Sequence, residues 1–237
     1  MYEFKPIHQH YDDGLGATGE AFKEAADRLS ESINGSRFLH AKIPICYLYR
    51  HAIELYLKSM IVVVHRRLYL PWTEGKDDAR PRLKIGDELR YLDRLHNIGD
   101  LYVYLKHLIH EQKDRINALG NTDWDSFPQE LDTWIETIQS GDATSTFFRY
   151  PTLGKISKDH IKSDFQENSV EEILERVRLT GKPMKVYVEE EEKDGQTKIY
   201  EYVDGARLEE LKAALTKTAD FLSGAHFGFR MEVAGGR

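Results

Sequence analysis

The stretch that decides the fold lies at residues 47–58 and reads YLYRHAIELYLK. Its apolar character extends over a longer run, from about Lys42 to Leu68, which is the longest helical signal in the chain. Pro44 falls near the start of this run, where a missing amide proton costs a helix little. We therefore expect a long helix here, at the centre of a bundle.

Apolar residues at helical spacing predict further helices on both sides of this one. They cover residues 19–33, about twenty residues from Ile98, a helix begun by Ser126 and Pro128, a short helix at 170–179, and a last helix at 206–222 that stops at Gly224. The predicted fold class is mostly α, an up-and-down helical bundle in a single domain of residues 1–237.

Three stretches depart from the helical pattern. Residues 73–87 are charged and contain glycine and proline without periodicity, so we expect a mobile loop. Alternating residues flank Asp194-Gly195, which favours a β-hairpin at about 184–203, inserted before the C-terminal helix. Residues 146–151 are aromatic and basic, and we expect them to be extended.

Composition excludes several classes of protein. An apolar share of 41% with 31% charged residues is that of an ordinary globular domain. Cys46 is the only cysteine, which excludes a disulfide framework and a thiolate metal site. Residues 1–16 are polar and lack the apolar stretch of a secretory signal, and charges interrupt residues 43–64, the most apolar window. We expect a cytoplasmic protein that does not enter a membrane.

The known phosphate-binding and metal-binding motifs are missing. No Walker loop, dinucleotide-binding glycine pattern or nucleophile elbow occurs, and His107, His110 and Glu111 lack the His-Glu-x-x-His spacing. The polar segment His8 to Asp13 is expected to be solvated. We therefore expect no cofactor and no metal. A net charge of −7 disfavours extended wrapping of nucleic acid but permits a local basic patch that binds a short or single-stranded segment.

Arg50, Glu54 and Lys58 follow one another at four-residue spacing, so they share one face of the central helix. We call these three residues the charged row. If the helix is buried, its charges must pair with one another or face a cleft. Two interpretations stay open: a structural ion network, or a site at which Arg50 and His51 meet a phosphate or an RNA backbone.

Three segments together resemble a HEPN-like family of bacterial helical proteins. They are YLYRHAIELYLKSMI at 47–61, LHNIGDLYVYLKHL at 95–108 and FFRYP at 147–151. The resemblance covers most of the chain. It implies an α-helical bundle that often forms a homodimer and serves RNA-directed or antiviral stress functions.

The ribonucleases of that superfamily carry an arginine followed four to six residues later by a histidine, and the pair acts across a dimer. Arg90 and His96 have this spacing but lie at a loop-to-helix boundary, away from the expected position late in the bundle. Arg149 lies in the expected region, yet the next histidine, His160, is too distant in sequence. The chain departs from the nuclease pattern at this point.

The leading hypothesis is a regulatory module of stress response or phage defence that binds RNA or a protein encoded nearby. The alternatives are a divergent metal-independent endoribonuclease at a dimer-interface cleft and a structural subunit of a larger complex. His96 could equally be a helix-start residue held by hydrogen bonds, and Arg149 an anchor to Glu54 or another carboxylate. The catalytic candidates are His51, His96 and Arg149, and the RNA- or ligand-binding candidates are Arg50, His51, Glu54, Lys58, Arg149 and Tyr150.

Overall fold

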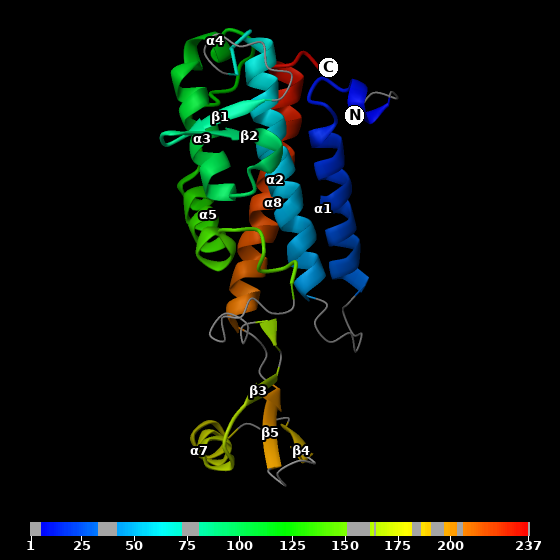
Figure 1. The fold of residues 1–237 in the computed structure, drawn as a ribbon, viewed down its shortest axis with the longest axis vertical. Coiled ribbons are helices and arrows are strands. Elements are labelled where there is room, and N and C mark those ends of the chain that lie inside the picture. Colours follow the sequence, from blue (N-terminus) through cyan, green and yellow to red (C-terminus); the bar gives the residue numbers. More distant parts are fainter. Residues whose placement is uncertain are drawn as a thin grey trace.

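The molecule is built around a bundle of helices packed side by side (Figure 1). The computed structural model describes residues 6–32, 42–72, 81–150, 162–163, 165–181, 186–190, 197–202 and 206–236. The bundle consists of α1 (Leu15–Ser32), α2 (Lys42–Arg67), α3 (Ile98–Glu111), α5 (Gln129–Asp142) and α8 (Ala206–Glu232). α2 packs against α1, α3 and α8, and α5 packs against α3 and α8. The mostly helical class and the central place of α2 are confirmed.

α2 occupies the centre because its apolar residues surround the helix on every side. Residues 52–65 are all buried, including the charged Glu54 and Lys58. Its observed bounds agree with the predicted ones to within one residue. None of the helices in the described ranges is both long and apolar enough to cross a membrane.

Several predicted helix ends are wrong. α1 begins at Leu15, four residues before the expected residue 19, and α5 begins at Gln129 with Pro128, not Ser126, as its N-cap. The helix expected to run about twenty residues from Ile98 ends at Glu111, and a short α4 (Lys113–Asn117) follows. α8 continues past Gly224, its predicted stop, to Glu232. Phe229 and Val233 beyond that glycine are fully buried, so core packing outweighs the weak helix propensity of glycine.

A hairpin lies where part of a mobile loop was expected. β1 (Arg82–Ile85) and β2 (Glu88–Tyr91) pair antiparallel across a turn at Gly86, whose φ is +60°. Leu83 is fully buried and holds the hairpin on the bundle. The loop prediction is therefore wrong for residues 81–87, while 73–80 lie outside the described residues.

A small α/β unit lies beyond one end of the bundle (Figure 1). β4 (Val186–Glu190) and β5 (Thr197–Tyr202) form the predicted hairpin, whose turn lies outside the described residues. β3 (Phe165–Glu167) pairs with the other edge of β5, so the sheet has three strands and not the two expected. α7 (Val170–Thr180) confirms the predicted short helix. Two single 3-10 turns complete the described elements, η1 (Ile7–Gln9) and η2 (Leu92–Arg94).

Candidate functional site

The charged row is buried and internally paired. The side chains of Arg50, Glu54 and Lys58 are 2%, 2% and 5% exposed. Lys58 Nζ lies 2.8 Å from Glu54 Oε1, and Arg50 Nη1 lies 3.4 Å from Glu54 Oε2. The three side chains are therefore arranged as a structural ion network. Their burial keeps these three candidates away from a ligand at the surface.

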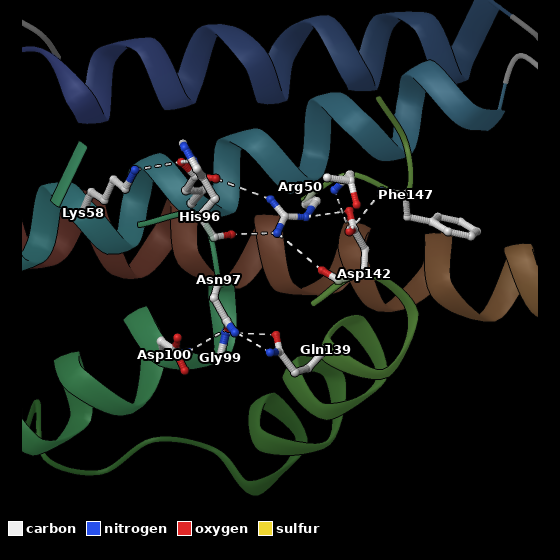
Figure 2. Close-up of polar contacts among 11 residues, drawn as sticks. Arg50, Lys58, His96, Asn97, Gly99, Asp100, Gln139, Asp142 and Phe147 are labelled. Atoms are coloured by element: carbon white, nitrogen blue, oxygen red, sulfur yellow. Dashed lines mark hydrogen bonds and ion pairs between the residues drawn. The ribbon is translucent and has the colours of Figure 1, made fainter. Parts of the chain in front are cut away.

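Arg50 joins three helices of the bundle, as Figure 2 shows. Its Nη2 donates to the backbone carbonyl of His96 at 2.7 Å, and its Nε lies 3.0 Å from Asp142 Oδ2. Asp142 Oδ1 in turn accepts from the backbone N–H groups of Thr146 and Phe147 at 3.0 and 3.1 Å. One guanidinium therefore fixes both the segment before α3 and the turn after α5.

His96 lies between the buried charges and the surface. It directly precedes Asn97, which caps α3 by accepting from the backbone N–H of Asp100 at 3.0 Å. Its side chain is 40% exposed, and its Nδ1 lies 3.0 Å from Glu54 Oε1. This geometry agrees with the structural interpretation of His96, in which it is a residue at a helix start held by hydrogen bonds.

The carboxylate of Glu54 sets the tautomer of His96. Burial raises the pKa of Glu54, but Lys58 and His96 outweigh burial and hold this pKa below its usual value. An ionised carboxylate only accepts hydrogen bonds, so we assign the proton of the neutral imidazole to Nδ1. Nε2 then presents its lone pair, and no described residue bonds to it. A carboxylate that orients a histidine in this way recurs in catalytic and ligand-binding sites.

His51 lies half-buried on α2, one residue after Arg50. The edge of its ring contacts Phe22, with the ring centroids 4.5 Å apart, and its face stacks near Tyr47. Burial lowers the pKa of His51, and the nearby cations, including Arg149, lower it further. His51 is therefore a neutral ring at pH 7 that lies within electrostatic range of Arg149.

Arg149 and Tyr150 are exposed in the turn that Asp142 holds. The backbone N–H of Arg149 donates to the carbonyl of Thr146 at 3.2 Å, so the segment described as far as Tyr150 is a turn. The prediction of an extended segment is wrong, because Asp142 bends the chain by accepting two backbone N–H groups. Pro151 lies outside the described residues.

Two sequence-based pairings are not found among the described residues. Glu54 contacts Arg50, Lys58 and His96, and Arg149 does not pair with it. Arg90 lies on β2, where its guanidinium is 2.8 Å from Glu88 and 4.0 Å from Asp100. The Arg90 and His96 spacing therefore corresponds to no contact between the two side chains in the described part of the chain.

A second polar cluster was missed by the sequence analysis. Asp12 Oδ2 accepts from Ser59 Oγ at 2.5 Å and from the backbone N–H of Gly16 at 2.7 Å. Ser59 Oγ lies 2.8 Å from His226 Nε2, and Asp12, Ser59 and His226 are all buried. The expectation of a solvated N-terminal segment is wrong for Asp12. Asp12 also lies 3.9 Å from His226 Nε2, and no local pattern in the sequence links it to Ser59 on α2 and His226 on α8.

Asp12, Ser59 and His226 are the residue types of a hydrolytic triad, but here the serine, and not the histidine, lies between the other two. Burial lowers the pKa of His226 to about 4, so its ring is neutral. The single hydroxyl proton of Ser59 goes to Asp12, which makes His226 the donor to Ser59 and prevents it from acting as its base. The cluster therefore ties the segment before α1 to α2 and α8 and does not activate a nucleophile.

Neither a metal site nor a known relative defines the chemistry. Among the described residues, no three or more His, Cys, Asp or Glu side chains are grouped so that they could hold a metal ion. Comparisons with family models, with curated proteins and with solved structures find no match to this chain.

Proposed function

We propose that the chain binds single-stranded RNA through a small surface formed by His51, His96, Arg149 and Tyr150, which we call the His96 surface. The observation that carries the proposal is the partly exposed His96 ring, oriented by the buried Glu54. Arg50 holds the backbone of His96 and, through Asp142, the turn that presents Arg149 and Tyr150. The backbone of His96 and the turn that carries Arg149 and Tyr150 are thereby both tied to Arg50 on α2, the residue before His51.

The chemistry of this surface suits a short single strand. A guanidinium pairs with a phosphate oxygen, and an exposed tyrosine ring offers a face on which a base stacks. Tyr150 is 56% exposed, and Arg149 precedes it in the same turn. The net charge of −7 supports a local contact of this kind over extended wrapping of a duplex.

The test is a titration of a fluorescently labelled RNA of ~12 nucleotides, within the size range of single-strand sites, followed by anisotropy. We expect the Arg149→Ala, Tyr150→Ala double variant to bind about tenfold more weakly, because a stacking contact and a phosphate contact are lost. The control is Arg28→Ala, which removes one positive charge from an exposed ion pair on α1.

A folded wild-type protein that leaves the anisotropy unchanged at low salt would refute RNA binding. Equal losses in the double variant and in Arg28→Ala would also refute it, because binding would then follow net charge and not this surface. Circular dichroism of each variant shows whether the bundle is intact.

A second candidate function is metal-independent RNA cleavage, and the Glu54–His96 contact favours it. His96 Nε2 would take the proton of a 2′-hydroxyl, and Arg149 would stabilise the charge that develops on the phosphate. The 2′ oxygen forms a bond to phosphorus, the bond from phosphorus to the 5′ oxygen breaks, and that oxygen takes a proton from solvent.

Cleavage is tested in EDTA with His96→Gln beside His107→Gln, whose histidine is 68% exposed on α3 and faces Glu111. Cutting that persists in His107→Gln and disappears in His96→Gln, with RNA binding retained, supports this candidate. A folded wild-type protein that binds RNA without cutting it excludes cleavage and leaves the binding function in place.

The resemblance to the HEPN-like family supports a cytoplasmic homodimer that acts in stress response or phage defence. Light scattering of the purified protein tests the dimer. A monomer at micromolar concentration would restrict the proposal to a surface that works within one chain.

A further inference from the structure

An open cavity of about 600 Å³ lies at the C-terminal end of α2. This is the end of the bundle away from the small α/β unit (Figure 1). The described part of the cavity wall is formed by Tyr11 and by the last turn of α2 with the segment that follows it, as far as Trp72. Its volume falls within the range of natural small-molecule sites, and it shares no residue with the His96 surface.

The cavity wall is positively charged. Two of its described residues are arginines and none is acidic. Arg66 Nη1 donates to the carbonyl of Tyr11 at 2.6 Å, and its Nη2 pairs with the exposed Asp13 at 2.7 Å. Because Tyr11 belongs to the same wall, these contacts hold the guanidinium beside the cavity. They use two of its five N–H donors, so the other donors are left for a ligand.

The neighbouring Arg67 is a half-buried cation on the same wall. Within the part of the chain that the structure describes, its side chain has no ion pair, and its Nε is shielded from solvent without an acceptor. Partial burial of a charge without a counterion is unfavourable. An anion in the cavity would compensate the charge of Arg67.

Tyr69 presents an exposed ring at a position that favours glycine. The N–H of Leu70 donates to the carbonyl of His65 at 2.9 Å, which is the hydrogen bond of a Schellman motif at a helix end. Tyr69 is the left-handed residue of this motif, with a φ of +54°. A Cβ disfavours that conformation, so the position is usually glycine. The Tyr69 side chain is 91% exposed, so packing of the ring does not offset this strain.

Trp72 adds a second aromatic ring to the wall. It stacks on the buried His65 ring, with the ring centroids 4.0 Å apart and the planes 10° apart. His65 Nε2 lies 3.0 Å from the Tyr104 hydroxyl, which anchors the stack to α3. The wall therefore combines two aromatic rings with two arginines, a composition that suits a ligand with a planar ring and an anionic group.

We propose that this cavity binds a nucleoside 5′-monophosphate. The base stacks on Tyr69, and the phosphate pairs with Arg66 and Arg67. A phosphate offers a guanidinium two oxygens at once, and stacking on an aromatic ring accepts any base. A nucleoside without the phosphate would leave the arginines uncompensated, and phosphate alone would leave the Tyr69 ring in water. The inference is independent of RNA binding, since it rests on different residues.

The first experiment is a calorimetric titration of the whole protein with adenosine 5′-monophosphate, beside adenosine and inorganic phosphate. We expect the nucleotide to bind with a dissociation constant of about 1 mM or below, because one stacked base and a charge-assisted phosphate contact act together. Adenosine and phosphate, which each make one of the two contacts, should bind at least about tenfold more weakly.

Tyr69→Gly separates a ligand-binding role of this ring from a structural one. Glycine suits the left-handed conformation, so we expect Tm to rise while the nucleotide binds about tenfold more weakly. A structural role would lower Tm instead. Tyr69→Phe keeps the ring and is the matched control, which should bind the nucleotide like the wild type.

Arg67→Gln tests the phosphate contact. It removes the charge that lacks a counterion among the described residues, and we expect nucleotide binding about tenfold weaker. Arg28→Gln, in an exposed pair with Glu24 on α1, removes the same charge elsewhere and should leave binding unchanged.

The proposal is overturned if the folded protein does not bind the nucleotide, or if adenosine or phosphate alone binds equally well. It is also overturned if either Tyr69→Gly or Arg67→Gln binds the nucleotide as tightly as the wild type. None of these results bears on the RNA titration, because every variant leaves the His96 surface intact.

Discussion

Arg50 holds His96 in place through the backbone and not through the ring, since its Nη2 donates to the His96 carbonyl at 2.7 Å. The ring is oriented separately by Glu54. The same guanidinium reaches Asp142 at the end of α5. The position of His96 and that of the turn after α5 therefore depend on one buried cation, whereas the orientation of the ring depends on a different residue.

Replacing this cation should destabilise the whole bundle. Arg50→Met leaves Asp142 buried without its ion pair and removes a donor from the His96 carbonyl, and we expect the free energy of unfolding to fall by about 3–5 kcal/mol. Urea denaturation followed by circular dichroism measures this change. Arg28→Met, in an exposed pair with Glu24, should change the same quantity by less than about 1 kcal/mol. Similar losses in both variants would contradict the structural role of Arg50.

Stability should fall in mildly acidic solution because of two buried histidines. Burial lowers the pKa of His65 and of His226 from 6.5 to about 4. Between these pH values the unfolded chain binds more protons than the folded one. The free energy of unfolding is therefore highest above about pH 6.5 and decreases as the pH falls from 6.5 to about 4. Each histidine should account for about 3 kcal/mol of this loss. Denaturant midpoints measured from pH 7 to pH 4 report it.

A single variant separates the contribution of one histidine. His226→Gln keeps a donor for Ser59 but does not titrate, so it should lower stability at pH 7 and flatten the pH dependence by about half. If the variant has the same pH dependence as the wild type, the buried position of His226 does not control the acid sensitivity.

Two helical glycines should respond in opposite directions to the same substitution. A Cβ at Gly16 would overlap the His226 ring and the Asp12 carboxylate, so Gly16→Ala should destabilise the protein by about 1–3 kcal/mol. Gly224→Ala meets no neighbour and should stabilise α8 by about 0.5–1 kcal/mol. Thermal unfolding of both variants measures the difference, and a loss of stability in Gly224→Ala would contradict the open space at Gly224.

Cys46 should resist modification in the folded protein. Its side chain is fully buried in the bundle core, and burial raises the pKa of its thiol to about 12, so almost no thiolate forms at pH 8. A thiol reagent should react only after addition of denaturant. Rapid reaction with the native protein would indicate that the start of α2 opens on the time scale of the assay.

The parts of the fold that follow from local pattern were predictable, and the parts that depend on distant packing were not. The apolar run of α2 gives its bounds directly. The continuation of α8 depends on the burial of Phe229 by other helices, which overrides the local stop signal at Gly224. The β1–β2 hairpin was missed because four-residue strands are too short to show a clear alternation.

In the candidate site, too, local sequence pattern predicts some contacts and not others. Four-residue spacing places Arg50, Glu54 and Lys58 on one face, and burial makes their pairing necessary. The spacing does not show that His96 and Asp142, 46 and 92 residues further along the chain, complete the network. Residues this far apart in sequence carry no periodic signal that links them, so their contact becomes known only from the packing of α3 and α5 against α2 and α8.

The charged row also sets an order for folding during synthesis. α2 is apolar enough to collapse early, yet burying Arg50 before Asp142 emerges would leave its charge insufficiently compensated. Synthesis proceeds from the N-terminus, so Asp142, the second carboxylate partner of Arg50 beside Glu54, leaves the ribosome 92 residues after Arg50. The buried network around Arg50 is therefore complete only after α3 and α5 have been synthesised.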